Sequence, residues 1–202
     1  MRYSESHKQE THQKLVDAAA RMLREKGPDG FGVAELMNEA GLTHGGFYAH
    51  FESKEACVAE ATREIFTQMG RRTANHVEGL PPRHALATVI DLYVSPYHRD
   101  NAGDGCPVTS LNSEMPRQPQ AVRDAFDAGV KMMVTGMKKR LADAHIDDAE
   151  SLAPAVLAAM VGAVSMSRAV SDKTLSDELL VAARNGIKTR LGLNDNMLSE
   201  TA

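Results

Sequence analysis

The stretch from Val33 to Lys54 contains the residue types best suited to hydrogen bonding with a polar partner. Phe47 and Phe51 are four residues apart, so on a helix they share one face, which we expect to pack inward. The opposite face consists of glycine and alanine, which would let a helix backbone lie close to base edges in a DNA major groove. The residues that these features predict to contact DNA are His44, Gly45, Gly46, Tyr48, His50 and Lys54.

Lys54 is an independent indication of an anionic partner. A cation in the first turn of a helix opposes the helix dipole, and a bound phosphate at the same place would reverse that effect. The alternative is a solvated lysine beside Glu55. Tyr48, His44 and His50, each taken alone, also have ordinary structural interpretations, so the pattern gains its meaning as a set.

Cys106 and Cys57 are the two cysteines of the chain. Cys106 is predicted to begin a helix, where the dipole would lower the thiol pKa and suit it to sensing electrophiles or oxidants. The alternative is a small residue packed at a helix start, and Cys57 is interpreted as structural. A base and nucleophile pair of His98 and Cys106 would make an enzyme, but no other catalytic motif supports it. We therefore expect no catalytic residue, no metal and no cofactor.

Helices must position these residues, because the 202-residue chain has no tryptophan, 4% aromatic residues and few prolines or glycines. Start and stop signals predict about nine helices in an all-α fold. The first ends at Gly27-Pro28-Asp29-Gly30, Thr43 and Ser53 are predicted caps, residues 95–105 are predicted to be a loop, and residues 194–202 are expected to fray. The other helices are expected over residues 33–40, 43–50, 54–77, 83–94, 106–115, 120–143, 149–169 and 176–191.

The segment from Leu152 to Val164 is apolar on every helical face, which a helix in water tolerates only if it is buried all round. Ser165, Ser167 and Arg168 interrupt it too soon for a membrane span. Two alternatives remain: the core of a monomer, or a seam between two copies of the chain. The residues predicted for such a homodimer seam are Ala158, Ala159, Gly162, Ala163, Leu179 and Ala183.

The net charge and the first residues of the sequence indicate which partners and which cellular location to expect. The formal net charge is −4, which argues against a surface that binds polyanions generally. Residues 1–26 carry six Lys/Arg against four Asp/Glu, a net of +2, so local basic charge lies at the beginning of the chain. The beginning lacks the apolar segment of a secretory signal, so we expect a cytoplasmic protein with no membrane partner.

The motif residues resemble the DNA-binding module of the TetR family of bacterial transcriptional regulators. The match lies within about residues 10–60, in Gly30-Phe31, Ala40-Gly41-Leu42-Thr43, Gly46-Phe47-Tyr48, His50-Phe51 and Ser53-Lys54-Glu55. The resemblance implies a helix-turn-helix DNA-binding domain over residues 1–52 and a helical effector-binding and dimerisation domain over residues 53–202. Gly32 departs from the pattern, because the family commonly has Thr or Ser there.

The resemblance also implies that Thr43 contacts a phosphate or a base. It further implies a homodimer on double-stranded DNA that usually represses until a small molecule releases it, and the two copies would require a palindromic operator. The Cys106 argument adds an electrophile or oxidant as an alternative effector.

The resemblance places the effector pocket among the middle helices, where an adaptable apolar lining is expected. Plain core packing is the alternative for each of these residues. The other alternative for the whole chain is a helical interaction protein that no longer binds DNA. The predicted pocket residues are Phe66, Met69, Tyr93, Cys106, Phe126, Met133 and Met137.

Overall fold

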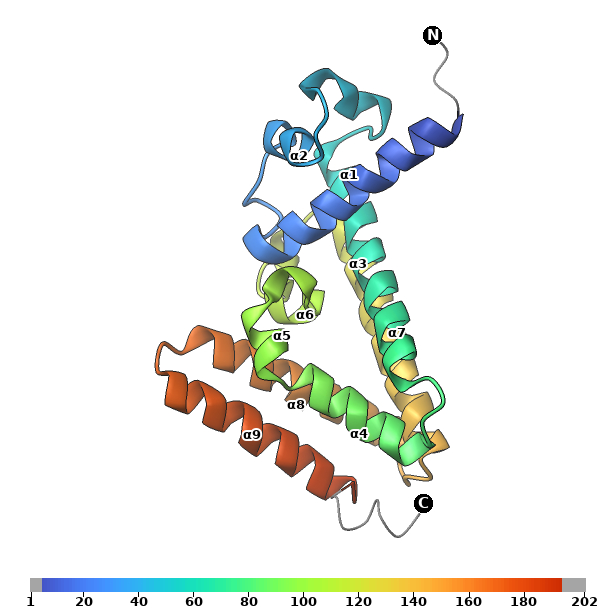
Figure 1. Cartoon of the computed structure of the whole chain (residues 1–202), viewed down its shortest axis with the longest axis vertical. Coiled ribbons are helices and arrows are strands. Elements are labelled where there is room, and N and C mark those ends of the chain that lie inside the picture. Colours follow the sequence, from blue (N-terminus) through green and yellow to red (C-terminus); the bar gives the residue numbers. More distant parts are fainter. Residues whose placement is uncertain (1–4, 194–202) are drawn as a thin grey trace. The chain divides into compact units, whose positions relative to one another are not determined.

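The computed structural model describes residues 5–193, apart from the side chain of His44, and is helical throughout (Figure 1). Nine α-helices and three short 3₁₀ helices occur in these residues, and no strand is found among them. The predicted all-α fold is therefore confirmed. The chain separates into two compact units: one contains the described residues up to Gln68 together with Cys106–Gly129, and the other contains Met69–Gly105 and Val130 onward. The predicted domain boundary at residues 52 and 53 stays a prediction.

The first unit begins with α1, whose carboxyl-terminal half is apolar and buried from Leu15 to Leu23. Phe66 of α3 packs edge-on against Phe126 of α7, with 5.8 Å between ring centroids. A Cβ atom at Gly129 would lie 2.0 Å from the Phe66 ring, so only glycine fits there. The elements are α1 (Glu5–Lys26), α2 (Val33–Glu39), η1 (His44–Ala49), the first part of α3 (Lys54–Val77), α6 (Pro107–Leu111), η3 (Met115–Arg117) and the first part of α7 (Gln120–Asp143).

The second unit is built on α8 (Ala149–Ala169) and α9 (Lys173–Arg190), which lie side by side (Figure 1). Leu86 and Ile90 of α4 (Pro82–Tyr93) join their core and are fully buried. Leu141 and Met137 from the end of α7 complete it. This core uses the apolar pattern of α8 as predicted, but on one side only.

The predicted loop over residues 95–105 is wrong, because it contains α5 (Pro96–Asp100) and η2 (Ala102–Asp104). The Ser95 hydroxyl accepts a hydrogen bond from the backbone N–H of His98 at 3.2 Å. Pro96 occupies the first helical position, where its fixed φ suits a helix and its missing N–H costs nothing. A Ser-Pro start signal was therefore present and was obscured by the surrounding glycine, asparagine and aspartate.

Two further helix predictions need correction. The helix expected over residues 106–115 ends at Leu111 and is followed by η3, which contains Pro116. The last helix begins at Lys173, three residues earlier than predicted, because the Asp172 carboxylate accepts hydrogen bonds from the backbone N–H groups of Thr174 and Leu175. The helices over residues 54–77, 120–143 and 149–169 agree with the prediction.

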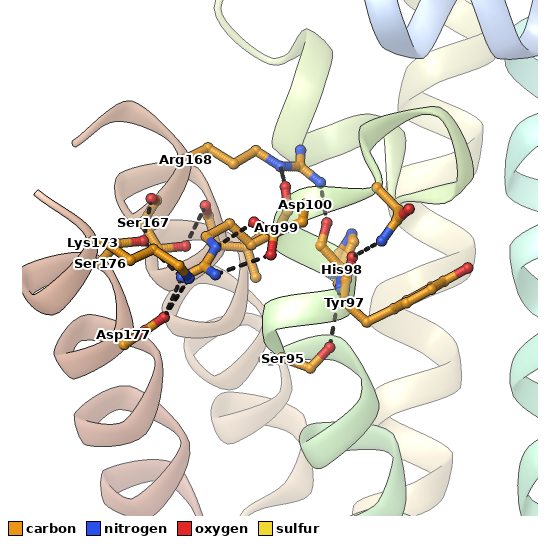
Figure 2. A network of polar contacts seen from close by, with 12 residues as sticks. Ser95, Tyr97, His98, Arg99, Asp100, Ser167, Arg168, Lys173, Ser176 and Asp177 are labelled. Carbon is orange, nitrogen blue, oxygen red and sulfur yellow. Dashed lines mark hydrogen bonds and ion pairs between the residues drawn. The ribbon is translucent and has the colours of Figure 1, made fainter. Parts of the chain in front are cut away.

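A buried arginine fastens α5 to the turn between α8 and α9 (Figure 2). The Arg99 side chain is 4% exposed and pairs with Asp100 at 2.7 Å and Asp177 at 2.5 Å. It also donates to the Ser176 hydroxyl at 2.9 Å. Arg168 donates to the backbone carbonyls of His98 and Arg99 at 2.5 and 2.9 Å. We call Arg99, Arg168, Ser176 and Asp177 the Arg99 network.

One side of the α8–α9 pair is exposed in the single chain. Ala158 and Ala159 of α8 are exposed, and Met166 and Val181 are 56% and 46% exposed. The prediction that α8 is buried all round is therefore wrong for one chain alone. Within residues 5–193, α8 is also the one helix that is long and apolar enough to cross a membrane. Its remaining apolar residues form the core of the second unit.

Candidate nucleic-acid interface

The turn between α2 and η1 is held by backbone hydrogen bonds. The N–H of Leu42 donates to the Met37 carbonyl at 2.8 Å, and the N–H of Gly41 donates to the Asn38 carbonyl at 3.0 Å. This pair of bonds is a Schellman motif, which requires a left-handed residue, and Gly41 has φ +70°. The predicted stop at Gly41 is confirmed, and the motif fixes the direction in which η1 leaves α2.

The segment predicted as a second α-helix is a 3₁₀ helix, η1. The N–H of Gly46 donates to the Thr43 carbonyl at 3.1 Å, three residues back rather than four. Gly45 and Gly46 have the lowest helix propensity apart from proline, so the segment lacks the local preference that would hold the wider α-helical turn. Thr43 occupies the N-cap position, but its side chain caps nothing there, which corrects the predicted side-chain cap.

One side of η1 is anchored by aromatic rings. Phe47 is fully buried and Phe51 is 5% exposed, with their ring centroids 5.3 Å apart. η1 packs against α2, where Leu36 and Met37 are buried. The prediction that both phenylalanines face inward is confirmed, although the route is a 3₁₀ segment followed by a four-residue hydrogen bond from the N–H of Phe51 to the Phe47 carbonyl.

The other side of η1 is exposed. Tyr48 is 70% exposed, and its ring stands edge-on to Phe47 at 5.3 Å. Gly45 and Ala49 are exposed, and a Cβ atom at Gly45 would meet nothing within 4 Å. Gly46 is half-buried, with the Met37 methyl 3.4 Å from its Cβ position. The side chain of His44 lies outside the described part of the chain. This face combines open backbone with a projecting phenol, which suits close contact with a polar surface.

The start of α3 lies directly after this face. The Ser53 hydroxyl accepts a hydrogen bond from the backbone N–H of Ala56 at 3.1 Å, so the predicted cap is confirmed. Hydrogen bonds from Ser53 and from its own backbone N–H lower the pKa of the Glu55 carboxyl, as expected at an electropositive helix terminus. The Lys54 ammonium lies 5.1 Å from the centre of the buried Phe31 ring. Gly32 occupies the N-cap position of α2 and has no side chain to cap it, unlike the Thr or Ser common in the resembling family.

His50 has a neighbour that the motif does not reveal. The ring of His12, from α1, lies 5.8 Å from the His50 ring and 4.7 Å from the Phe51 ring. The Nε2 atom of His12 is 2.6 Å from the Glu60 carboxylate on α3. The signal was present in the sequence, because residues 5, 8, 9, 12 and 13 are polar at helical spacing on α1.

The residues predicted for an effector pocket are divided between the two units. Phe66, Cys106 and Phe126 belong to the first unit and are buried. Met69, Tyr93, Met133 and Met137 belong to the second, where Met137 is part of the core. Cys106 is 2% exposed at the start of α6. Cys57 is 1% exposed, and burial raises the pKa of its thiol to about 12, which fits a structural role.

The predicted seam residues occupy the exposed side of α8 and α9 to different degrees. Ala158 and Ala159 are exposed, and Gly162 is half-buried with nothing within 4 Å of its Cβ position. Leu179 and Ala183 are half-buried, whereas Ala163 is 7% exposed and faces the core. Among the described residues, no cluster of His, Cys, Asp and Glu could hold a metal ion.

Comparison with known proteins matches both parts of the chain. Residues 15–68 match the family model described as bacterial regulatory proteins of the tetR family. Residues 82–180 match the C-terminal domain model described as transcriptional regulator LmrA/YxaF-like.

Individual relatives agree with these models. The transcriptional repressor DhaR of Mycobacterium sp. (strain GP1) is 28% identical over 113 residues, 55% of each chain, so the match spans about half the length of DhaR. The regulator LmrA of Bacillus subtilis (strain 168) is 22% identical over 82% of this chain and 90% of LmrA. The crystal structure of reduced Escherichia coli NemR has a similar fold, with a TM-score of 0.78 at 19% identity over 89% of this chain and 96% of NemR.

Proposed function

The chain belongs to the TetR family of transcriptional regulators, and from this premise we propose that it is a homodimeric repressor of a palindromic operator. Its relatives are named as regulators, and the chain is not an enzyme. In the proposal, a small molecule or an electrophile or oxidant releases the repressor from DNA. Two copies of η1 would enter successive major grooves about 34–36 Å apart.

The exposed face of η1 is the observation that carries this proposal. Gly45 and Ala49 leave its backbone open, while Tyr48 projects into solvent at 70% exposure. Because Phe47 and Phe51 anchor the other side of η1, the phenol of Tyr48 is held in a position from which it can donate a hydrogen bond to a partner. Base edges would contact the open backbone and His44, and phosphates would contact Thr43, Tyr48, His50 and Lys54.

The exposed side of α8 and α9 supports the dimeric part of the proposal. Small residues there, including Ala158, Ala159 and Gly162, would let helices of two copies approach closely. The apolar side chains of Met166, Leu175 and Val181, which are 43–56% exposed, would be covered at the same time. Covering such a patch is favourable at about 25 cal/mol per Å² of apolar surface.

The effector part of the proposal depends on the match of residues 82–180 to a regulator C-terminal domain. Cys106 is the candidate for electrophiles and oxidants, and its burial means that a reagent must first enter the first unit. The test compares the alkylation rate of Cys106 with that of Cys57. The raised pKa of Cys57 makes its thiol a poor nucleophile at neutral pH. Faster alkylation of Cys106 together with loss of DNA binding supports a sensor, and equal rates contradict it.

A matched pair of glycine variants tests DNA binding. We expect Gly45→Leu to fold normally, because nothing lies within 4 Å of the new Cβ, but to lose binding to duplexes selected from a random library. Gly70→Leu on α3 is equally unhindered and should bind like the wild type. Fluorescence anisotropy at fixed salt measures both. Equal binding by the two variants would remove η1 from the interface.

The dimer is tested in the same way with Gly162→Leu. The new side chain meets open space in one chain but overpacks a close contact between two chains, so we expect a folded monomer by light scattering. Gly70→Leu serves again as the control and should remain dimeric. A dimeric Gly162→Leu protein would place the seam elsewhere.

A further inference from the structure

The Lys54 ammonium is held over an aromatic ring rather than beside a carboxylate. Its nitrogen lies 5.1 Å from the centre of the Phe31 ring, and Phe31 is 4% exposed. This distance is within the range of about 6 Å over which the face of a ring attracts a cation. Lys54 begins α3 and Phe31 lies just before α2, so a cation–π contact joins two elements of the first unit.

The position of Phe31 is set by the turn after α1. A Cβ atom at Gly30 would lie 1.9 Å from the Lys26 carbonyl oxygen, so only glycine lets the chain pass this close to the end of α1. Phe31 follows directly, and its side chain is part of the buried core. The ring is therefore fixed by packing. Lys54 has a flexible four-carbon stem, so it is the partner whose position the contact restricts.

The charge of Lys54 is not neutralised, in contrast to a second lysine nearby. The Lys26 ammonium lies 2.5 Å from the Glu35 carboxylate. No ion pair of Lys54 with a carboxylate is found among residues 5–193. The adjacent carboxylate of Glu55 is engaged by hydrogen bonds at the start of α3. A phosphate that approaches Lys54 therefore meets a positive charge that no carboxylate has to release.

A ring is better suited than a carboxylate to hold a cation that has to bind an anion. The ring attracts the ammonium through its quadrupole and carries no net charge, so it restricts the side chain without cancelling its charge. The start of a helix repels a cation, and the ring face offsets this repulsion. A lysine that is already restricted also loses less conformational entropy when a ligand binds. The pair thus presents a full positive charge at a defined place.

We propose that Phe31 is a positioning residue for DNA binding, because its ring holds the Lys54 ammonium where a backbone phosphate of the operator can reach it. The inference rests on the proposed function, which places a phosphate at Lys54. It adds a buried residue that touches no DNA to those that determine affinity. It requires that the contribution of Lys54 to binding depends on the electron density of the Phe31 ring.

Fluorinated phenylalanines test the ring with almost no change in its size. Phe31 is replaced in the full chain by phenylalanine with one, two or three fluorine atoms, which withdraw electrons and weaken the attraction of the ring face for a cation. Binding to a library-selected duplex is measured by fluorescence anisotropy at fixed pH and salt. We expect affinity to fall stepwise with fluorine number, by about threefold for each protomer and about tenfold for a dimer over the series.

Variants of Lys54 are the matched controls. In the Lys54→Met protein no charge lies over the ring, so the same fluorine series should change affinity very little. Lys54→Arg keeps a cation that stacks on aromatic rings, so it should keep the trend. A purely structural role of Phe31 would give equal losses in all three backgrounds. Thermal unfolding of each protein measures that structural role separately.

Nuclear magnetic resonance detects the contact in the free protein. The ring current of Phe31 should shield the methylene protons next to the Lys54 ammonium, and Phe31→Leu should remove this shielding. The fluorinated proteins carry the test if Phe31→Leu does not fold. Unshielded protons in the wild type would show that the ammonium leaves the ring in solution, which overturns the inference without any DNA.

The remaining outcomes separate this inference from the proposed function. Tight binding by the wild type that does not change along the fluorine series overturns the inference and leaves the proposed repressor intact. A trend of equal size in Lys54→Met means that the ring acts through the fold, which also overturns it. Failure of the wild type to bind any selected duplex contradicts the proposed function, and the inference fails with it even where the ring shields Lys54.

Discussion

His50 in the first unit and His98 in the second are both kept neutral by burial, but they face different surroundings. His50 lines an open groove, and its Nδ1 atom makes no hydrogen bond with any described residue. His98 is 8% exposed, and its Nδ1 atom lies 2.7 Å from the Tyr93 carbonyl, beside the Arg99 network (Figure 2). Burial disfavours a proton on His98 and the nearby Arg168 guanidinium repels it, while the hydrogen bond to the Tyr93 carbonyl offsets only part of this cost.

The difference separates an imidazole that lines an open surface from one that is fixed in a packed core. We expect acid to weaken the stability of the second unit through His98. The following experiments test how far the two regions behave independently.

The largest expected effect is acid destabilisation through His98. Burial lowers its pKa to about 4 from an ordinary 6.5, so the unfolded chain binds this proton below about pH 6.5 and the folded chain does not until about pH 4. Stability is therefore fully present above 6.5 and falls by about 3 kcal/mol as pH drops to 4. Urea unfolding at several pH values measures it, and His98→Asn should flatten this part of the profile. An unchanged profile in the variant would assign the loss to other groups.

Arg99→Met should cost about 2 kcal/mol of unfolding free energy at pH 7. The variant removes a buried guanidinium and with it the hydrogen bonds to Ser176, Asp100 and Asp177, of which Asp177 keeps its pairing with Lys173. The cost stays below that of a fully buried pair, because Asp100 and Asp177 are 58% and 50% exposed. Lys173→Ala, which removes an exposed pair with Asp177, should cost well under about 1 kcal/mol. Equal costs for the two variants would mean that the Arg99 network adds no more than surface charge.

Ser53→Ala should cost about 1 kcal/mol, because it removes the side-chain cap of α3. Thr43→Ala is the matched control, since Thr43 also occupies an N-cap position but its side chain accepts no capping bond. We expect almost no change in unfolding free energy from it. A loss of stability as large as that of Ser53→Ala would indicate a cap at η1 that forms in solution.

Lys54→Ala should have the smallest effect on stability, a few tenths of a kcal/mol, since a cation in the first turn of a helix gains little. Its effect on DNA binding should be uniform across sequences and should lower the slope of log affinity against log salt by about one. A change in sequence preference instead would place Lys54 on a base.

The first unit was the more predictable from sequence, and the reason is physical. Its key contacts are local, so the spacing of the residues predicts them. They involve the turn at Gly41, the cap at Ser53 and the ring pair of Phe47 and Phe51. The contact between the His12 and His50 rings was missed because these residues are 38 positions apart, and the polar spacing on α1 does not say which residue it faces.

The second unit was less predictable for the same reason. Arg99 pairs with Asp177, which is 78 positions away in the sequence, and no local pattern predicts such a pair.

In the first unit, the helix type of η1 was missed, because the prediction followed the motif and did not weigh the low helix propensity of its two glycines. The two glycines give little α-helix propensity, and the spacing of the apolar residues does not show this.

The 3₁₀ form of η1 sets the length over which the chain can read DNA. Six residues rising about 2.0 Å each extend about 12 Å, whereas the same residues as an α-helix would extend about 9 Å. The difference of about 3 Å is close to the 3.4 Å step between successive base pairs. If the glycine pair were replaced by alanine and η1 rewound into the wider α-helix, the contacts at its far end would move by about one base pair. In the proposed function, the winding of these six residues would therefore affect which operator sequence the chain prefers.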